Sequence, residues 1–313
     1  MKVDQIINAD CLVRLKKMDD NCIDLIVTSP PYAGKRGDDY DTQPITGYVK
    51  WFLPISAELL RVLKPTGSFV LNIKEPAIGG VRSTYIIELI LEMKEQGWEW
   101  TEEYIWRKTT SFPGYWNNRF RDGWERCLHF TKKVMKTKKV MDSKTKKMKS
   151  QKRRIPFTMN QDAVQIPIGE WAKTRLRKNK GTEKKTRKDM EKTNSDDTKR
   201  RRSNSGSGLE REVANWLPRD KVNPDNVLEF APTGNNKKEH SATFPDKLPE
   251  WFIKLFTNPG DLVLDPFIGS GTTAVVAKKL GRHYIGIEKN KTYARQTTKK
   301  LNEIKKQKKI GDF

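Results

Sequence analysis

Four consecutive residues, Ser29-Pro30-Pro31-Tyr32, are the strongest chemical signal in this 313-residue sequence. They follow the apolar run Leu25–Val27, which predicts a buried strand, and prolines end such a strand because their nitrogen has no hydrogen to donate. The Ser29 hydroxyl, the freed carbonyls and the π-face of Tyr32 together suit a flat heteroaromatic ring that carries an amine. Taken alone, the four residues also fit a plain strand-ending turn.

A second motif, Leu262–Thr273, reads as an apolar strand, a glycine-rich turn and the start of a helix. Gly269 and Gly271 let the backbone approach a ligand closely, and the helix offers free N–H groups in its first turn. A dinucleotide, a phosphate or only a tight connection all fit this turn. The turn lacks the third glycine of the dinucleotide-binding fingerprint and also the lysine of the phosphate-binding loop. Beyond Asp265, Glu288 ends the next apolar run, where a carboxylate can accept hydrogen bonds from a ribose diol.

Both motifs resemble those of DNA amino-methyltransferases, which methylate an exocyclic amine of a base. Asp24–Tyr32 resembles the catalytic motif of that family, and Asp265–Gly271 resembles its S-adenosylmethionine motif. The resemblance implies S-adenosyl-L-methionine as the cofactor, with Glu288 at its ribose and Phe267 near its adenine. The residues implied for cofactor binding are Asp10, His240, Asp265, Pro266, Phe267, Gly269, Ser270, Gly271, Thr272 and Glu288.

Two of these cofactor residues also have a structural interpretation. Asn8–Cys11 resembles the segment that contacts the adenine amine, with Asp10 as the acceptor, but an acid at a strand-to-helix turn is often an N-cap. His240–Pro245 resembles the segment on the cofactor's other side. A hydrogen bond that positions its own loop fits His240 equally well, and we expect no proton-transfer role for it.

In the catalytic segment, the resemblance implies that Ser29, Pro30, Pro31 and Tyr32 receive a base flipped out of the duplex. Tyr32 then stacks on the ring, while the Ser29 hydroxyl and the Pro30 carbonyl accept hydrogen bonds from the amine. Serine in the first position is typical of relatives that act on the N4 amine of cytosine, whereas aspartate or asparagine is typical of those acting on adenine N6. We therefore expect cytosine, with adenine as the alternative. Some serine-type relatives have an aspartate where Asn72 stands, so a proton relay through that position is not expected.

The order of the motifs, catalytic first and cofactor last, matches the circularly permuted class of these enzymes that is often labelled beta. The resemblance covers residues 1–132 and 236–313. It implies a sequence-specific modification enzyme of a restriction-modification system, acting on double-stranded DNA beside a cognate restriction endonuclease. Two other hypotheses stay open, an RNA methyltransferase and a non-enzymatic nucleic-acid binder with the same fold.

The elements that must position these residues alternate between strand and helix, which predicts a mostly parallel α/β sheet. The resemblance implies that this is a Rossmann-like S-adenosylmethionine-dependent methyltransferase sheet, circularly permuted, with a basic target-recognition insert. A turn at Lys64–Gly67 and a helix stop at Gly97 are expected. Strands are predicted at Leu25–Thr28, Ser68–Ile73, Trp98–Trp106, Arg126–Phe130, Leu262–Leu264 and His283–Glu288. Helices are predicted at Tyr48–Leu63 (beginning near Pro54), Tyr85–Gln96, Trp251–Thr257 and Thr272–Leu280.

The net charge of +23 is concentrated in two segments. Residues 131–154 hold twelve Lys and Arg against one acid, and residues 172–202 hold fourteen against five. Such blocks favour a polyanion partner through phosphate neutralisation, although a solvated surface insert is the plain alternative. We expect a catalytic half at 1–132, a basic target-recognition insert at 133–235 and a cofactor half at 236–313. Single cations expected at DNA are Lys35, Arg36, Arg119 and Arg121.

Cysteine and histidine are scarce, with three of each in the chain. Cys11, Cys22 and Cys127 show neither metal-ligand spacing nor a disulfide pattern, so core thiols and no metal are expected. No secretory pattern and no long apolar run is found, which predicts a cytoplasmic protein without a membrane span.

Overall fold

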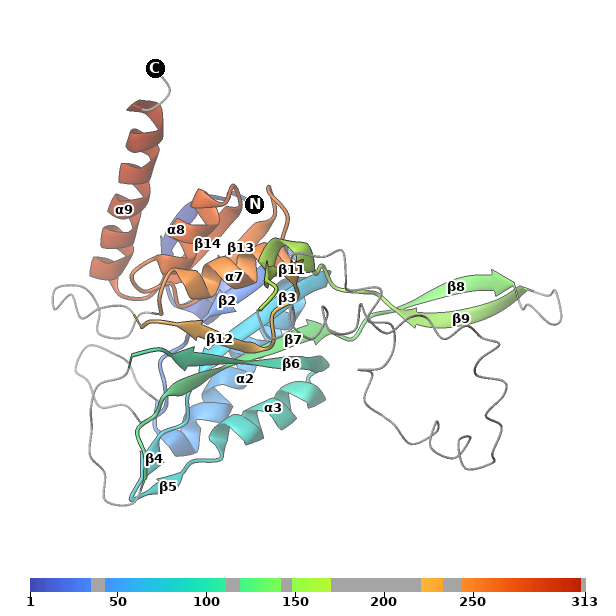
Figure 1. Cartoon of the computed structure of the whole chain (residues 1–313), viewed down its shortest axis with the longest axis horizontal. Helices are drawn as coiled ribbons and strands as arrows, with labels where there is room; N and C mark the ends of the chain where they lie inside the picture. Colours follow the sequence, from blue (N-terminus) through green and yellow to red (C-terminus); the bar gives the residue numbers. More distant parts are fainter. Residues whose placement is uncertain (35–42, 111–118, 142–147, 170–220, 233–243, 311–313) are drawn as a thin grey trace, which may run out of the picture. The chain divides into compact units, whose positions relative to one another are not determined.

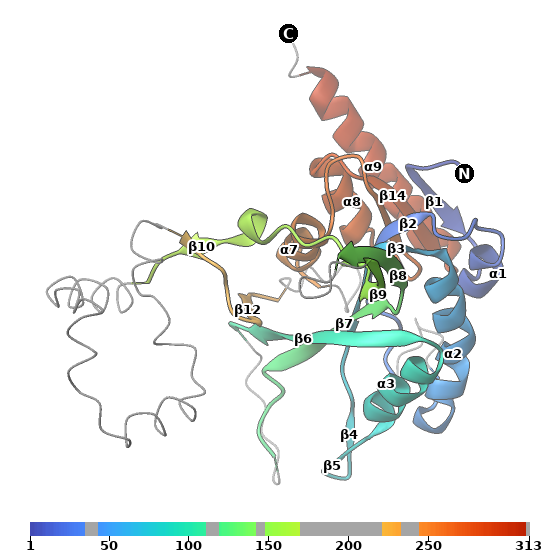
Figure 2. The same cartoon turned by 90° about the vertical axis from the view of Figure 1, so that its right-hand side faces the viewer.

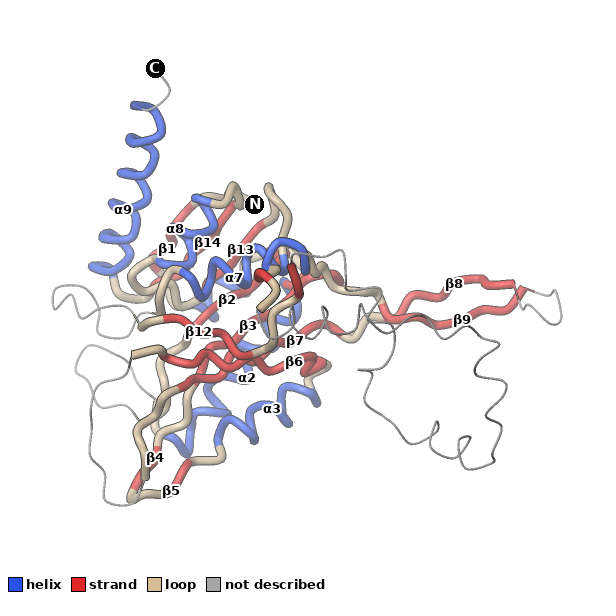
Figure 3. The backbone as a smooth tube through the Cα atoms, viewed as in Figure 1, coloured by secondary structure: helices blue, strands red, loops and turns tan. Residues whose placement is uncertain are grey.

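The computed structural model describes residues 1–34, 43–110, 119–141, 148–169, 221–232 and 244–310, drawn in colour in Figures 1 and 3. The chain divides into two compact units, one comprising Met1–Ala163 with Asp225–Phe313 and the other Val164–Pro224. In the second unit the described residues form a small antiparallel pair, β10 (Ile166–Pro167) with β11 (Lys221–Val222). The first unit carries the central sheet and all of the motifs above.

The central sheet has eight strands and is mostly parallel, as the alternating pattern predicts. Only the pairs β3–β7 and β7–β6 are antiparallel. In spatial order the strands are β1 (Gln5–Asn8), β14 (His283–Glu288), β13 (Leu262–Asp265), β2 (Ile23–Thr28), β3 (Leu63–Ile73), β7 (Trp124–Lys132), β6 (Trp98–Lys108) and β12 (Val227–Phe230). Strand β13, which begins the glycine-rich motif, therefore lies directly beside β2, which leads into Ser29–Tyr32. Leu25 of β2 pairs with Val263 of β13, although 238 positions separate them in the sequence.

Helices cover both faces of this sheet (Figure 2). On one face α1 (Cys11–Leu15), α2 (Ile45–Val62) and α3 (Tyr85–Glu95) pack together over the main apolar core. The other face carries α7 (Lys247–Phe256), α8 (Thr272–Lys279) and α9 (Lys291–Ile310). In the part of the chain that the structure describes, no helix combines the length and the apolarity that crossing a bilayer requires.

Two local expectations are confirmed and two are wrong. Gly97 follows α3 with a φ of +104°, a left-handed conformation that favours glycine, and β14 has the predicted bounds. Helix α2 begins at Ile45, so Pro54 lies inside it rather than at its start. The expected turn at Lys64–Gly67 is an irregular part of β3, where the pairing with β2 shifts register. Packing overrode local preference at both places, because the buried face of α2 extends on both sides of its proline.

The lysine-rich region also contains strands that local patterns do not predict. Strands β8 (Met135–Met141) and β9 (Met148–Arg154) form an antiparallel pair that projects from the sheet (Figure 1). Strand β12 pairs in parallel with β6 and completes the central sheet. The β8–β9 pair and β12 belong to the first unit. The segment 133–235, which we expect to recognise the target, therefore includes one strand of the central sheet, β12.

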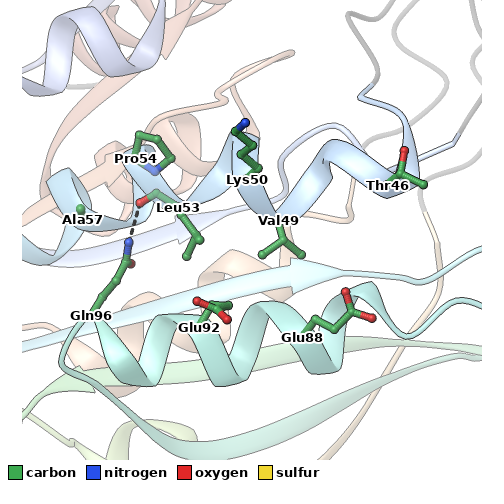
Figure 4. Close-up of a pocket in the computed structure, with 9 residues that line it drawn as sticks. All are labelled: Thr46, Val49, Lys50, Leu53, Pro54, Ala57, Glu88, Glu92 and Gln96. Atoms are coloured by element: carbon green, nitrogen blue, oxygen red, sulfur yellow. Dashed lines mark hydrogen bonds between the residues drawn. The ribbon is translucent and has the colours of Figure 1, made fainter.

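A surface groove of about 620 Å³ lies between α2 and α3 (Figure 4). The Gln96 side chain closes one end by donating to the Leu53 carbonyl at 2.8 Å. The residues that line the groove are Thr46, Val49, Lys50, Leu53, Pro54, Ala57, Glu88, Glu92 and Gln96. None of these residues belongs to the predicted motifs, so the groove is separate from the candidate active site.

Parallel pairing brings the carboxyl ends of β1, β14, β13, β2 and β3 to one edge of the sheet, which we call the carboxyl edge. Strand β7 runs the other way and therefore begins at this edge. Ligands of open α/β sheets bind in the crevice outside these strand ends. Ser29, Asp265 and Glu288 stand at or just beyond the ends of their strands, so the fold brings the two motifs to the same edge.

Candidate active site

The Asp265 carboxyl group joins the two motifs. Its Oδ1 accepts the hydroxyl of Thr28, the last residue of β2, at 2.6 Å, and its Oδ2 accepts the hydroxyl of Thr273 in α8 at 2.7 Å. The backbone N–H of Phe267 donates to Oδ1 at 3.1 Å. Asp265 is only 2% exposed, so it shapes the turn from within. Burial raises the pKa of this carboxyl to about 6, and the three donors oppose that rise.

The glycine-rich turn is built so tightly that only glycine fits its last position. Gly271 has a φ of +89°, and a Cβ there would stand 2.3 Å from Thr297 Cγ2 of α9. Thr297 also donates its hydroxyl to the Gly269 carbonyl at 2.9 Å. Helix α9 thus supports the turn from behind, while a Cβ on Gly269 would contact only the Phe267 carbonyl, at 3.9 Å.

Glu288 lies against the same turn from the neighbouring strand. Its two oxygens accept the backbone N–H of Gly269 at 2.9 Å and of Asn290 at 2.8 Å. Partial burial raises the pKa of this carboxyl, and the backbone donors lower it. A carboxylate has about four acceptor positions, so two backbone donors leave capacity for the two hydroxyls of a ribose.

Asp10 follows β1, whose last residue, Asn8, is the register partner of Glu288. It is the N-cap of α1 and accepts the N–H of Val13 at 3.1 Å, as the structural interpretation predicts. Its side chain is exposed, and a carboxylate that caps with one oxygen keeps further acceptor positions. The cap therefore does not conflict with a ligand contact.

The remaining residues of the cofactor motif follow in the turn. Pro266 is buried, and Phe267 is half-buried with its ring 5.9 Å from that of Trp51. The hydroxyls of Ser270 and Thr272 lie 3.4 Å apart at the start of α8. His240 lies outside the described residues. Acceptor carboxylates, a half-exposed aromatic ring and a close backbone turn fit a nucleoside whose ribose meets Glu288.

The catalytic segment is held by a chain of hydrogen bonds that ends on a carboxylate. The Ser29 hydroxyl donates to the Tyr32 hydroxyl oxygen at 3.2 Å, and the Tyr32 hydroxyl donates to Glu125 Oε2 at 2.7 Å. Burial and the nearby Glu125 charge raise the pKa of Tyr32 well above its usual value, so its proton stays in place. This direction of donation leaves the lone pairs of Ser29 Oγ available to an incoming amine.

Glu125, at the start of β7, is a candidate site residue that the sequence does not reveal. Its other oxygen accepts Lys108 Nζ at 2.6 Å, and Asn72 contacts both Glu125 and the Tyr32 hydroxyl. The position where some relatives have an aspartate thus holds an amide, and the carboxylate comes from the adjacent strand. No local pattern marks Glu125, because its proximity to Tyr32 depends on the pairing of β3 with β7.

None of the three cysteines is placed as a nucleophile for this segment. Cys127 is fully buried behind Asn72, whose Nδ2 lies 3.7 Å from its sulfur, and burial raises the pKa of the thiol. Burial also raises the pKa values of Cys11 and Cys22. A thiol that stays protonated is a poor nucleophile, so the site offers acceptors rather than covalent attack.

Of the cations expected at DNA, Lys35 and Arg36 lie outside the described residues. Arg119 and Arg121 stand in the connection from β6 to β7, at the carboxyl edge, where Arg119 pairs with Asp122 at 3.0 Å. Arg121 is exposed. Among the residues that the structure describes, no group of three His, Cys, Asp or Glu side chains is arranged to hold a metal ion.

A family model described as DNA methylase matches residues 23–299 of the chain. Among curated proteins, the chain is similar to the type II methyltransferase M.PvuII of Proteus hauseri, with 27% identity over 300 residues that cover 91% of this chain and 79% of the relative. It is also similar to the type II methyltransferase M.HinfI of Haemophilus influenzae, with 28% identity over 317 residues, 96% of this chain and 68% of the relative.

Two solved structures share the fold. The PvuII DNA methyltransferase, described as cytosine-N4-specific, superimposes with a TM-score of 0.60 and 22% identity, covering 97% of this chain and 95% of that one. The complex of M1.HpyAVI with SAM gives a TM-score of 0.54 and 21% identity, covering 95% and 98%. The Rossmann-like α/β sheet expected from the sequence is thereby confirmed.

The buried carboxyl of Asp265 predicts a specific pH dependence of stability. Its pKa is about 6 in the folded protein, against about 3.9 in the unfolded chain, so the native state binds more protons between these values and stability falls as pH rises through that window. Asp265→Asn removes this loss. Relative to the wild type, the variant should gain roughly 1–3 kcal/mol in unfolding free energy between pH 4 and pH 6.5, as measured by urea denaturation.

Thr28→Val provides the matched comparison because it keeps the carboxyl and removes one donor. Losing a donor to the ionised form raises the Asp265 pKa further, so this variant should lose more stability over the same window. Parallel pH curves for all three proteins would contradict the assigned role of Asp265.

Proposed function

The chain belongs to the N6/N4 DNA methylase family and is therefore a DNA methyltransferase; from this premise we propose that it methylates the N4 amine of a cytosine flipped out of duplex DNA. The observation that carries the proposal is the hydrogen-bond chain from Ser29 through Tyr32 to Glu125. It stands at the carboxyl edge next to the turn that Asp265 anchors. This arrangement thus offers acceptors to an amine beside a site for the methyl donor.

S-adenosyl-L-methionine is the cofactor of this family, and it supplies an electrophilic methyl group on its sulfonium. Glu288 would hold its ribose diol, Asp10 would accept from the adenine amine, and Phe267 would pack on the adenine face. The turn from Gly269 to Gly271 would lie against the methionine part of the cofactor. Each assignment uses an acceptor or a half-exposed surface that the fold leaves at the carboxyl edge.

At the base, Tyr32 provides a ring face for stacking, and its hydroxyl is fixed by Glu125. Ser29 Oγ and the Pro30 carbonyl accept hydrogen bonds from the two hydrogens of the amine. These contacts orient the nitrogen lone pair toward the methyl group, so positioning and electrostatics lower the barrier. With the cofactor bound, the C–N bond would form as the S–CH3 bond of the sulfonium breaks, and the amine would then release its extra proton to water.

Cytosine is favoured over adenine by the serine of the catalytic segment and by the structural neighbour described as cytosine-N4-specific. An amine is favoured over a ring carbon because methylation of a ring carbon needs a thiolate, and Cys127 is buried with a raised pKa. The basic segment 133–235 would contact the duplex phosphates as the target-recognition insert, between the halves 1–132 and 236–313. A role in a restriction-modification system, with a cognate endonuclease and a cytoplasmic location, completes the proposal.

Nucleoside analysis tests the proposed reaction directly. Unmethylated plasmid DNA incubated with the protein and labelled S-adenosylmethionine should yield N4-methylcytosine on digestion and mass spectrometry, at positions that define one sequence. N6-methyladenine instead would replace the cytosine assignment by the adenine alternative. Label that entered RNA but not duplex DNA would overturn the proposed substrate.

Two substitutions should separate the halves of the site. Ser29→Ala removes the acceptor for the amine and should slow methyl transfer about a hundredfold while the cofactor dissociation constant stays within about twofold. Glu288→Ala removes the ribose acceptor and should weaken cofactor binding about tenfold or more, measured by calorimetry. Equal losses of binding in both variants would contradict the division of roles.

Glu125→Gln tests the hydrogen-bond chain at nearly constant size. The amide can donate to Tyr32, which reverses the chain and engages a lone pair of Ser29, so single-turnover methyl transfer should slow about tenfold with cofactor affinity unchanged. Glu229→Gln is the control, since Glu229 pairs only at the surface, with Arg107 at 2.9 Å. A Glu125 variant as fast as the control would remove Glu125 from the mechanism.

A further inference from the structure

Three strongly exposed apolar side chains belong to two segments that leave the carboxyl edge. Phe120 is 94% exposed, Val81 is 73% and Ile78 is 62%, which makes them the three most exposed large apolar side chains among the described residues. Ile78 and Val81 come from the short strands β4 (Ala77–Ile78) and β5 (Val81–Arg82), and Phe120 comes from the connection between β6 and β7. Exposed apolar groups that gather at one place mark an interaction surface.

The segment that carries Ile78 and Val81 is a tight hairpin. The joining residues Gly79 and Gly80 have φ values of +57° and +85°, the left-handed pair that a two-residue hairpin turn requires. Across the hairpin, the Ser83 N–H donates to the Pro76 carbonyl at 3.1 Å. Figures 1 and 2 show the hairpin projecting away from the central sheet.

Charged residues tie the hairpin to the segment that carries Phe120. Asp122 pairs with Arg82 of β5 and, at 3.0 Å, with Arg119. Lys74 Nζ lies 3.7 Å from the same carboxyl and 3.6 Å from the centre of the Trp124 ring. We call the β4–β5 hairpin and the segment 119–122 the edge assembly, and the side chains of Ile78, Val81 and Phe120 its apolar tips. Ion pairs therefore hold the base of the edge assembly, whereas its apolar tips are exposed to water.

This assembly stands directly beside the catalytic segment. Lys74 follows the last residue of β3, and its carbonyl accepts the Tyr85 hydroxyl at 3.0 Å. Two residues before it, Asn72 lies 3.1 Å from the Tyr32 hydroxyl. The apolar tips consequently project from the edge at which the flipped base must enter.

We propose that Phe120, Ile78 and Val81 form an apolar wedge that enters duplex DNA beside the target base pair and occupies the stack vacated by the flipped base. Apolar side chains that insert between base steps are an established way to open a duplex, and basic neighbours such as Arg119 and Arg121 then meet the phosphates. The wedge stabilises the duplex in which the target base is flipped out, because its side chains replace the stacking that this base loses. The inference rests on the proposed function, in which the base leaves the helix.

Duplex oligonucleotides that carry the mapped recognition sequence test the wedge, with the target base either paired or opposite an abasic site. Phe120→Ala should slow single-turnover methylation of the paired duplex about tenfold or more and leave the abasic-partner duplex within about twofold of wild type, because that base needs little help to leave. Phe120→Trp should retain the paired-substrate rate. Ile78→Ala combined with Val81→Ala should show the same selective loss.

Leu91→Ala is the matched control, since Leu91 is also an exposed apolar residue, 58% exposed on α3, and it should not alter either rate. Equal losses of Phe120→Ala on both duplexes, or no loss on either, would overturn the wedge. A change in sedimentation caused by Phe120→Ala, with the rate ratio unchanged, would identify the tips as a contact between copies and would also overturn it. A wild-type protein that methylates neither duplex would instead refute the proposed function itself.

Discussion

The arrangement of this protein depends on one buried carboxyl group. Asp265 accepts hydrogen bonds from Thr28 at the end of the catalytic strand and from Thr273 in the helix after the cofactor turn. A buried carboxylate is costly unless donors satisfy it, and here three donors converge on it. This buried carboxyl group stands where β2 and the cofactor turn meet, and it links Thr28 to Asp265 across 237 positions of sequence. Motif order along the chain therefore matters little, because β13 and β2 are neighbours in the sheet.

Two supporting systems extend from this point. On the cofactor side, α9 presses Thr297 against Gly271 and binds the Gly269 carbonyl, so the turn cannot relax into another conformation. On the base side, the strand pairing of β3 with β7 brings Glu125 to the Tyr32 hydroxyl. Positioning of this kind matters for methyl transfer to a neutral amine, a reaction in which the protein contributes mainly geometry and acceptors.

We propose that two physically different surfaces meet DNA. The lysine-rich pair β8–β9 carries positive charge that would neutralise phosphates, and contacts of that kind set affinity and register. The proposed wedge is apolar at its tips and ion-paired at its base, a combination that resists bending while it contacts the base stack.

Local sequence patterns indicate the class of chemistry and predict most of the element order. Ser29–Tyr32, the turn at Gly269–Gly271 and the strand that ends at Glu288 are local patterns, and proline, glycine and apolar periodicity act within a few residues. For the same reason Gly97 correctly predicts the end of a helix. Pro54 wrongly predicts the start of one, because packing along the whole of α2 outweighs the local preference of proline.

Which distant groups meet depends on how the strands pair in the folded sheet. Glu125 becomes the partner of Tyr32, β12 joins the sheet, and Phe120 is exposed beside the β4–β5 hairpin, all through strand pairing. Asp265 likewise becomes an internal link between the two motifs. The physical reason is that hydrogen bonds between separate strands depend on register and on burial. Both are set by the packing of the whole sheet, so no window of sequence contains them.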